Sequence, residues 1–122
     1  MSRDWLLFLD DLIEAANKVA GFVEKRDFAA FHSDEGIFDA VLMNLLIVGE
    51  SVKQLPPEAI AAMPDVDWSG AAGLRDIIAH HYFAIDPELV WDIARNHVPP
   101  TRVAAMALRA KLDSQKEYNG AT

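Results

Sequence analysis

Five side chains able to take part in chemistry fall within eight positions of one apolar segment: Arg75, Asp76, His80, His81 and Tyr82. A histidine ring can act as a general acid or base close to neutral pH. A carboxylate that accepts the ring N–H of a histidine can fix its tautomer, as orienting acids do in acid–base sites. The segment could therefore carry acid–base chemistry, with His80 as the acid or base and Asp76 as the residue that orients it.

Helical geometry decides which of these side chains can meet. Asp76 and His80 are four residues apart and would lie about 40° apart on one face of a helix. Arg75 and Tyr82 are seven residues apart, so they are nearly aligned at a separation of about 10.5 Å. Arg75 and His80 point about 140° apart and cannot converge on one rigid helix. They could meet if the helix unwinds near His80, if Arg75 reaches around the helix, or if two subunits face each other.

Each of these residues also has an interpretation without catalysis. Arg75 with Asp76 could be a surface ion pair, which is usually worth less than about 1 kcal/mol. A single histidine is more often a structural group than a catalyst, and Tyr82 could be a half-buried aromatic with a polar tip. Two adjacent histidines resemble a metal site, but His80 and His81 would point about 100° apart and the H-E-x-x-H spacing is absent. We therefore predict no metal site.

The composition limits the class of protein and its partners. A chain of 122 residues fits a single domain, residues 1–122, and its 52% hydrophobic and 25% charged residues exclude a disordered chain. The net charge of −8 makes long-range attraction to nucleic acid weak or repulsive, so nucleic-acid chemistry would need a local positive site. The same acidity suits a basic protein partner. The sequence shows no cysteine, export signal or membrane-spanning stretch, so we expect a cytoplasmic protein.

Apolar residues recur at steps of three or four along most of the chain, whereas the alternation typical of strands is missing. We therefore predict an all-α protein, a bundle of four or five helices with short connections. Residues 26–35 should be non-helical, Pro99 and Pro100 should separate the last two helices, and residues 119–122 should fray. The predicted helices cover residues 3–25, 36–54, 70–82, 87–96 and 101–118, and residues 57–63 could form a further short helix.

The predicted helix over residues 36–54 is apolar on nearly all sides. Such a helix is buried on all sides, so it should be central in the bundle or should also face another subunit. Glu50 and Lys53 lie one turn apart on this helix. They could border a cleft or form a buried ion pair at an interface, and the sequence leaves both roles open.

The segment Arg75-x4-His80-x-Tyr82 matches the R-x4-H-x-Y signature of HepT-like proteins, inside the broader R-x4–6-H signature of HEPN domains. The surrounding sequence resembles the same family. Its segments IGEA…KLP, P-x-(I/V)-x-W…GLR and HxYF-x-(I/V)-D…VW resemble residues 48–56, 64–75 and 81–91 of this chain. The resemblance to the HepT-like branch of the HEPN superfamily runs from Arg3 to about Leu112, almost the whole chain.

The resemblance implies a HEPN-like bundle of four to five helices that forms a homodimer, with the motifs of two protomers sharing a cleft. It also implies a metal-independent ribonuclease toxin that needs no cofactor. In that site Arg75 would bind the scissile phosphate, His80 would be the general acid or base, and Asp76 would orient His80. The 2′-hydroxyl of the RNA substrate would be the nucleophile, which leaves a 2′,3′-cyclic phosphate.

Tyr82 has a separate role under the same resemblance. HepT-like toxins pair with a minimal nucleotidyltransferase antitoxin of MntA type, which transfers AMP to the tyrosine of the signature. The added bulk and negative charge would oppose RNA binding. Two alternatives stay open. The chain could be a non-catalytic, nucleotide- or substrate-binding partner of a nucleotidyltransferase, in which Arg75 and His80 hold a phosphate. Alternatively, the motif could have a purely structural role and hold the dimer together through Arg75–Asp76 ion pairs.

Overall fold

Every regular element among the described residues is a helix, so the all-α prediction is confirmed. The computed structural model describes the backbone of residues 2–64 and 66–120, and the side chains in these ranges except those of residues 2–4, 82 and 115–120. The long helices are α1 (Ser2–Val23), α3 (Glu35–Lys53), α5 (Trp68–His81) and α7 (Val98–Gly120). The shorter elements are α2 (Phe28–Ser33), α4 (Pro57–Ala62), the 3-10 helix η1 (Tyr82–Ala84), α6 (Pro87–Asp92) and the π-helix η2 (Ile93–His97).

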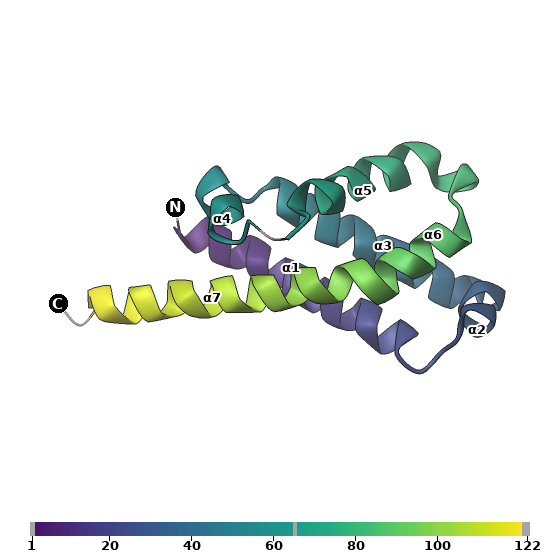
Figure 1. The fold of residues 1–122 in the computed structure, drawn as a ribbon, viewed down its shortest axis with the longest axis horizontal. Coiled ribbons are helices and arrows are strands. Elements are labelled where there is room, and N and C mark those ends of the chain that lie inside the picture. Colours follow the sequence, from purple (N-terminus) through teal and green to yellow (C-terminus); the bar gives the residue numbers. More distant parts are fainter. Residues whose placement is uncertain (1, 65, 121–122) are drawn as a thin grey trace.

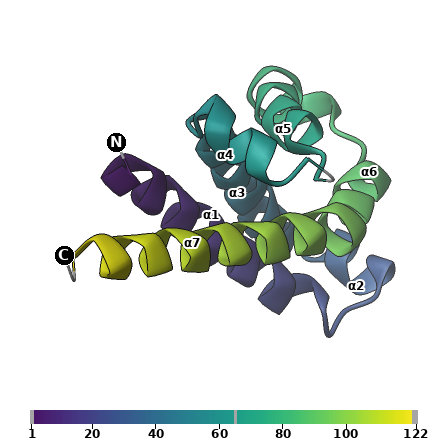
Figure 2. The ribbon, with the colours of Figure 1, turned by 60° about the vertical axis from the view of Figure 1, so that its left-hand side comes forward.

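The long helices pack in the order α7, α1, α3, α5. In Figure 1, α7 runs across α1 in the foreground, and α4 and α5 lie above them. Figure 2 shows α2 and α6 at the end of the bundle that is far from both termini. Because α3 contacts α1 on one side and α5 on another, it lies inside the bundle, as its all-round apolar sequence predicted, and α1 is an inner helix as well. The burial of α3 is incomplete, since the side chain of Met43 is 59% exposed.

The core explains why α1 takes its place beside α3. Leu9, Leu12 and Val19 lie on one apolar stripe of α1, and they have no exposed surface. Leu45 of α3 is buried to the same extent. Burying a leucine or valine side chain contributes about 1.5–3 kcal/mol, so this stripe fixes α1 against the inner side of the bundle.

The stretch 26–35 contains α2, so the prediction that it is non-helical was wrong. The side chain of Asp27 caps the helix by accepting a hydrogen bond from the backbone nitrogen of Ala30 at 2.8 Å. Phe31 is fully buried, and its ring centroid lies 5.1 Å from that of Trp91 in α6. A helix this short shows no apolar period, and an aromatic contact to a residue distant in sequence holds it in place.

Pro99 and Pro100 do not separate two helices, which corrects a second prediction. Instead α6 continues through η2 into α7 without a loop. A proline ring normally clashes with the carbonyl group four residues earlier, and for both prolines that carbonyl belongs to η2. The wider π turn accommodates the rings, and Thr101 Oγ1 donates to the carbonyl oxygen of His97 at 3.0 Å.

The other boundaries lie close to the predicted ones, as is usual for helix ends. The side chain of Asp86 caps α6 by accepting a hydrogen bond from the backbone nitrogen of Glu88 at 3.0 Å. Residues 119 and 120 belong to α7, while residues 121 and 122, where fraying was also expected, lie outside the described residues. No helix in the described ranges is long and apolar enough to cross a membrane.

Candidate active site

The candidate site lies where α3 and α5 pack closely together. Gly49 of α3 faces α5: a Cβ atom at this position would lie 2.8 Å from the carbonyl oxygen of Ala71 and 2.8 Å from Cβ of Arg75. A residue without a side chain is what allows this separation. The close approach places Arg75 against the last turns of α3, where it meets Glu50.

Arg75 and Asp76 form a network of ion pairs with α3. Nε of Arg75 lies 2.9 Å from Oε2 of Glu50, and its Nη1 lies 3.2 Å from Oδ1 of Asp76. Nζ of Lys53 lies 3.1 Å from the same oxygen of Asp76. The four side chains are between 36% and 51% exposed, so this is a surface network that salt weakens. Glu50 and Lys53 thus contact Arg75 and Asp76 directly, and the single chain does not bury them.

Glu50 and Lys53 are the site residues that the sequence did not assign. An acid and a base one turn apart on α3 face an adjacent base and acid on α5. Complementary charges on two helices show that they can pair, but not that the helices are neighbours. Gly49, next to Glu50 in a long apolar helix, is the signal of a close helix–helix contact that could have located this pairing.

The electrostatics of the network keep Asp76 ionised. The hydrogen bond from Lys53 is the largest cause that lowers the pKa of the Asp76 carboxyl from its ordinary value of 3.8, and the hydrogen bond from Arg75 is the next. Both cations favour the carboxylate over the acid. At neutral pH Asp76 is therefore an acceptor that two cations already occupy.

His80 lies one turn beyond Asp76 and is exposed. Within the described residues it makes no hydrogen bond or ion pair, so the expected contact with Asp76 is not formed in the single chain. The carboxylate is bonded to Lys53 and Arg75 instead, and charged donors are stronger partners for it than a neutral ring N–H. The structure thus brings Arg75 and Asp76 together and leaves His80 apart, in line with the angle of about 140° between Arg75 and His80 on a helix.

Tyr82 begins η1, directly after α5. Its backbone is described, but its side chain lies outside the described residues, so its hydroxyl is not placed. His81, the last residue of α5, leaves the helical region with φ of −130° and ψ of 27°, and its side chain is exposed. No cluster of three or more His, Cys, Asp or Glu residues that could hold a metal ion occurs among the described residues.

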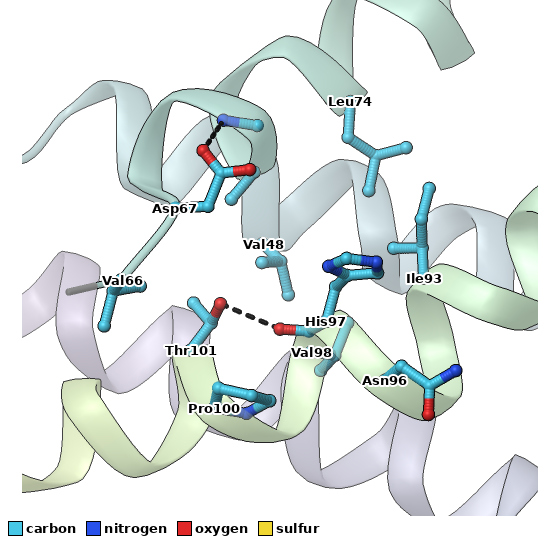
Figure 3. A pocket seen from close by; sticks show the side chains of 12 residues that line it. Val48, Val66, Asp67, Leu74, Ile93, Asn96, His97, Val98, Pro100 and Thr101 are labelled. Atoms are coloured by element: carbon cyan, nitrogen blue, oxygen red, sulfur yellow. Dashed lines mark hydrogen bonds between the residues drawn. The ribbon is translucent and has the colours of Figure 1, made fainter.

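A pocket of about 370 Å³ lies on a different face of α5, and none of the three candidate catalytic residues lines it. Figure 3 shows its apolar lining, which includes Val48 of α3 and Leu74 of α5. Its polar side chains are bonded within the protein: Asp67 accepts from the backbone nitrogen of Gly70 at 2.9 Å, and His97 pairs with an aspartate of α6 at 3.2 Å. The pocket therefore adds no reactive group to the site.

The sequence of this chain is similar to a known protein family and to several named proteins. Residues 12–108 match the family model described as "Ribonuclease HepT-like". Over 97 residues the chain is 40% identical to "Putative RNase MJ0127" of Methanocaldococcus jannaschii, and the alignment covers 80% of each chain. It is 37% identical over 97 residues to "Putative RNase MJ1380" of the same organism, which covers 80% of this chain and 89% of the relative.

A third relative, "Probable ribonuclease HepT" of Thermococcus cleftensis, is 29% identical over 99 residues, which cover 81% of this chain and 90% of the relative. No solved structure matches the chain significantly. The matched range 12–108 contains all of α3 and α5, and with them every residue of the ion-pair network.

Proposed function

The chain belongs to the ribonuclease HepT-like family, and on this premise we propose that it is a metal-independent endoribonuclease that acts at the α3–α5 site. One observation carries the proposal: within this family match, one helix presents a guanidinium fit for a phosphate, Arg75, and an exposed imidazole, His80. Relatives whose names call them RNases align over 80% of the chain, which supports the same chemistry.

The active cleft of this proposal lies between two copies of the chain. Arg75 and His80 diverge on α5, so a second protomer is the simplest source of the missing neighbour for each. α3 exposes an apolar stripe beside the network: Met43 is 59% exposed, and Leu46 and Ile47 are half-buried. Their spacing of three to four residues continues to Glu50, so a copy packed on this stripe would approach Arg75.

In the proposed reaction, the 2′-oxygen of RNA attacks the adjacent phosphorus while its proton passes to one His80 ring. The bond from phosphorus to the 5′-oxygen breaks, and that oxygen takes a proton from a water molecule, so one Arg75 and one His80 make up a complete pair. The products are a 2′,3′-cyclic phosphate and a 5′-hydroxyl. Arg75 stabilises the negative charge that develops on the phosphate oxygens. It thereby supplies the local positive charge that RNA chemistry needs on a protein that is acidic as a whole.

RNA binding in this scheme requires Arg75 to exchange its partners. Its contacts to Glu50 and Asp76 are surface ion pairs, each worth roughly 0–1 kcal/mol, and a phosphate that binds the guanidinium with two hydrogen bonds can replace them. Asp76 then keeps Lys53 and loses one cation. From its place one turn before His80 it can accept the ring N–H, which is the orienting role that the sequence suggested.

Regulation belongs to the same proposal. The chain would be the toxin of a toxin–antitoxin pair, and a cognate nucleotidyltransferase of MntA type would silence it by transferring AMP to Tyr82. Tyr82 follows the exposed His81 and lies two residues after His80, so a nucleotide attached there would stand beside the cleft. Its phosphate would repel the phosphate of RNA.

The test is an RNA-cleavage assay on tRNA and mRNA with EDTA present. We expect the wild-type protein to cut RNA under these conditions, and His80→Ala to lose about a hundredfold or more of the rate while it stays folded. His81→Ala is the matched control, because the neighbouring histidine is equally exposed but has no role in the proposed chemistry. Loss of cleavage in both variants, or cleavage that EDTA abolishes, would overturn the assignment.

A non-catalytic role is the second candidate, and one observation favours it. Two carboxylates hold Arg75 in a chain of net charge −8, which weakens the attraction of the site for RNA. The chain would then bind a nucleotide for a nucleotidyltransferase. A folded wild-type protein that cuts no RNA, but binds AMP in a manner that Arg75→Ala abolishes, would support this function over the ribonuclease.

A further inference from the structure

A groove is lined by residues of α2, the start of α3, η1 and the start of α6. Figures 1 and 2 show α2 and α6 at the end of the bundle away from both termini. The groove has a volume of about 470 Å³. We refer to it as the Phe83 groove; its lining residues are His32, Glu35, Phe38, Asp39, Phe83, Ile85 and Pro87. It shares no residue with the α3–α5 ion-pair network, and the function proposed above does not use it.

Phe83 is the feature that marks this groove as an interaction surface. Its side chain is 99% exposed, while Phe38 and Ile85 beside it are half-buried. A phenylalanine ring is a large apolar surface, and leaving it in water forgoes the stabilisation that burial would give. Single exposed aliphatic residues are ordinary, but a fully exposed aromatic ring that lines a groove together with two half-buried apolar side chains is suited to contact with a partner.

The charges around the groove indicate what kind of partner fits. Glu35 and Asp39 are exposed on its α3 side, and its described lining contains no lysine or arginine. Nucleic acid is disfavoured here, because phosphate binding depends on clustered cations. Contact of the groove with the same groove of a second copy is disfavoured too, because it would set Glu35 and Asp39 against the same acids of that copy. A protein segment that carries lysine or arginine next to an aliphatic or aromatic side chain matches both the acids and the apolar side chains Phe38, Phe83 and Ile85 of the lining.

We propose that the Phe83 groove is the docking site for such a segment of the nucleotidyltransferase partner, with Phe83 as the apolar anchor and Glu35 as a charge that selects a basic segment. This inference rests on the proposed function, which supplies the partner. Phe83 directly follows Tyr82, and neighbouring Cα atoms lie about 3.8 Å apart, so a partner held at the groove has its active site within reach of Tyr82. The groove therefore accounts for how the partner selects one tyrosine.

The binding experiment uses the chain with Tyr82→Phe, so that docking is measured without modification. The probe is the cognate MntA-type nucleotidyltransferase, and calorimetry gives its Kd. Adding Phe83→Ala should weaken binding about tenfold or more, as for a central aromatic anchor. Met106→Ala is the control, because Met106 is 51% exposed but lies on α7, and it should leave Kd unchanged.

The charge is tested by Glu35→Gln against Glu58→Gln. Both acids occupy the first turn of a helix, so the two changes alter net charge and helix-end electrostatics alike, but Glu58 belongs to α4, outside the groove. We expect Glu35→Gln to slow association several-fold and to reduce its salt dependence, and Glu58→Gln to do neither. Equal effects of the two variants would show that only overall charge matters and would overturn the assignment of Glu35.

The outcomes separate this inference from the proposed function. If wild-type Tyr82 gains AMP but Phe83→Ala binds and is modified normally, the groove is not the docking site and the function stands. If the partner binds through Phe83 but transfers nothing to Tyr82, the docking site stands and the modification fails. Phe83→Ala should remain a dimer that cuts RNA without the partner. Loss of the dimer would assign the groove to a second copy, and loss of cleavage would assign it to RNA. Failure of the wild-type chain to bind the partner would also refute the proposal.

Discussion

The contribution of Asp76 to stability should depend on pH, because Lys53 and Arg75 lower the pKa of its carboxyl. A carboxyl with a lower pKa in the folded chain stabilises the fold above its unfolded-state pKa, and this contribution is lost as pH falls through the folded pKa. Asp76→Asn should therefore be less stable than wild type at about pH 7, and the gap in free energy of unfolding should shrink below about pH 4. Urea unfolding across this pH range measures the gap. Asp11→Asn, an exposed change on α1, is the control, and a gap for Asp76→Asn that stays constant with pH would contradict the prediction.

Replacing Glu50 should improve RNA binding, because its carboxylate competes with the RNA phosphate for Arg75. Its Oε2 lies 2.9 Å from Nε of Arg75, where an RNA phosphate would bind under the proposed function. Glu50→Gln removes this negative charge, so KM for RNA should fall several-fold, with kcat changed by less than about twofold. Glu14→Gln breaks a similar surface pair, with Lys18 on α1, and should leave KM unchanged. A loss of kcat with constant KM would instead make Glu50 a residue that positions Arg75.

At this scale the sequence predicted the Arg75–Asp76 pair but missed its extension to Glu50 and Lys53. Adjacent residues on one helix are neighbours whatever the tertiary structure is. Ion pairs between α3 and α5 depend on which helices pack together and at what distance, and charge order alone does not specify either. The orienting contact of Asp76 with His80 depends on competition among donors, which helical spacing does not reveal.

The close approach of α3 and α5 is an element-scale property that depends on Gly49. A Cβ atom there would lie 2.8 Å from a backbone oxygen of α5, which cannot turn away as a flexible side chain could. Gly49→Ala should therefore destabilise the protein by about 1–3 kcal/mol and lower RNA cleavage by moving Arg75. Gly73→Ala, within α5, has nothing within 4 Å of the new Cβ and should stabilise by about 0.5–1 kcal/mol. Thermal unfolding of both variants tests the contrast, and equal shifts in Tm would refute it.

The elements that the sequence predicted well are those with a long apolar period, α1, α3 and α5. The two misses have local physical causes. α2 is too short to show a period and depends on a cap at Asp27 and on burial of Phe31 against α6. The junction of α6 with α7 survives Pro99 and Pro100 because a π turn precedes them, and a π turn has no signature that proline spacing predicts.

At the scale of the whole molecule, the single chain holds the parts of a nuclease site without joining them. Arg75 is bound to carboxylates, His80 is unpaired among the described residues, and α3 exposes Met43 beside them. The sequence predicted the all-α bundle from periodicity alone, but assembly depends on surfaces that one chain leaves open. Under the proposed function, the net charge of −8 limits where RNA can bind, and a cleft with two copies of Arg75 would supply the local positive charge.

The composite cleft can be tested by mixing two inactive variants. Arg75→Ala retains His80, and His80→Ala retains Arg75, so a mixed dimer rebuilds one complete pair only if the two residues act across the interface. Unfolding and refolding an equal mixture would make about half of the dimers mixed, each with one of its two pairs intact, so cleavage should return to about a quarter of the wild-type rate. Each variant refolded alone is the control and should stay inactive. A mixed dimer, verified by mass, that remains inactive would place the pair within one chain, and Arg75 would then have to leave Glu50 and reach around α5 to His80.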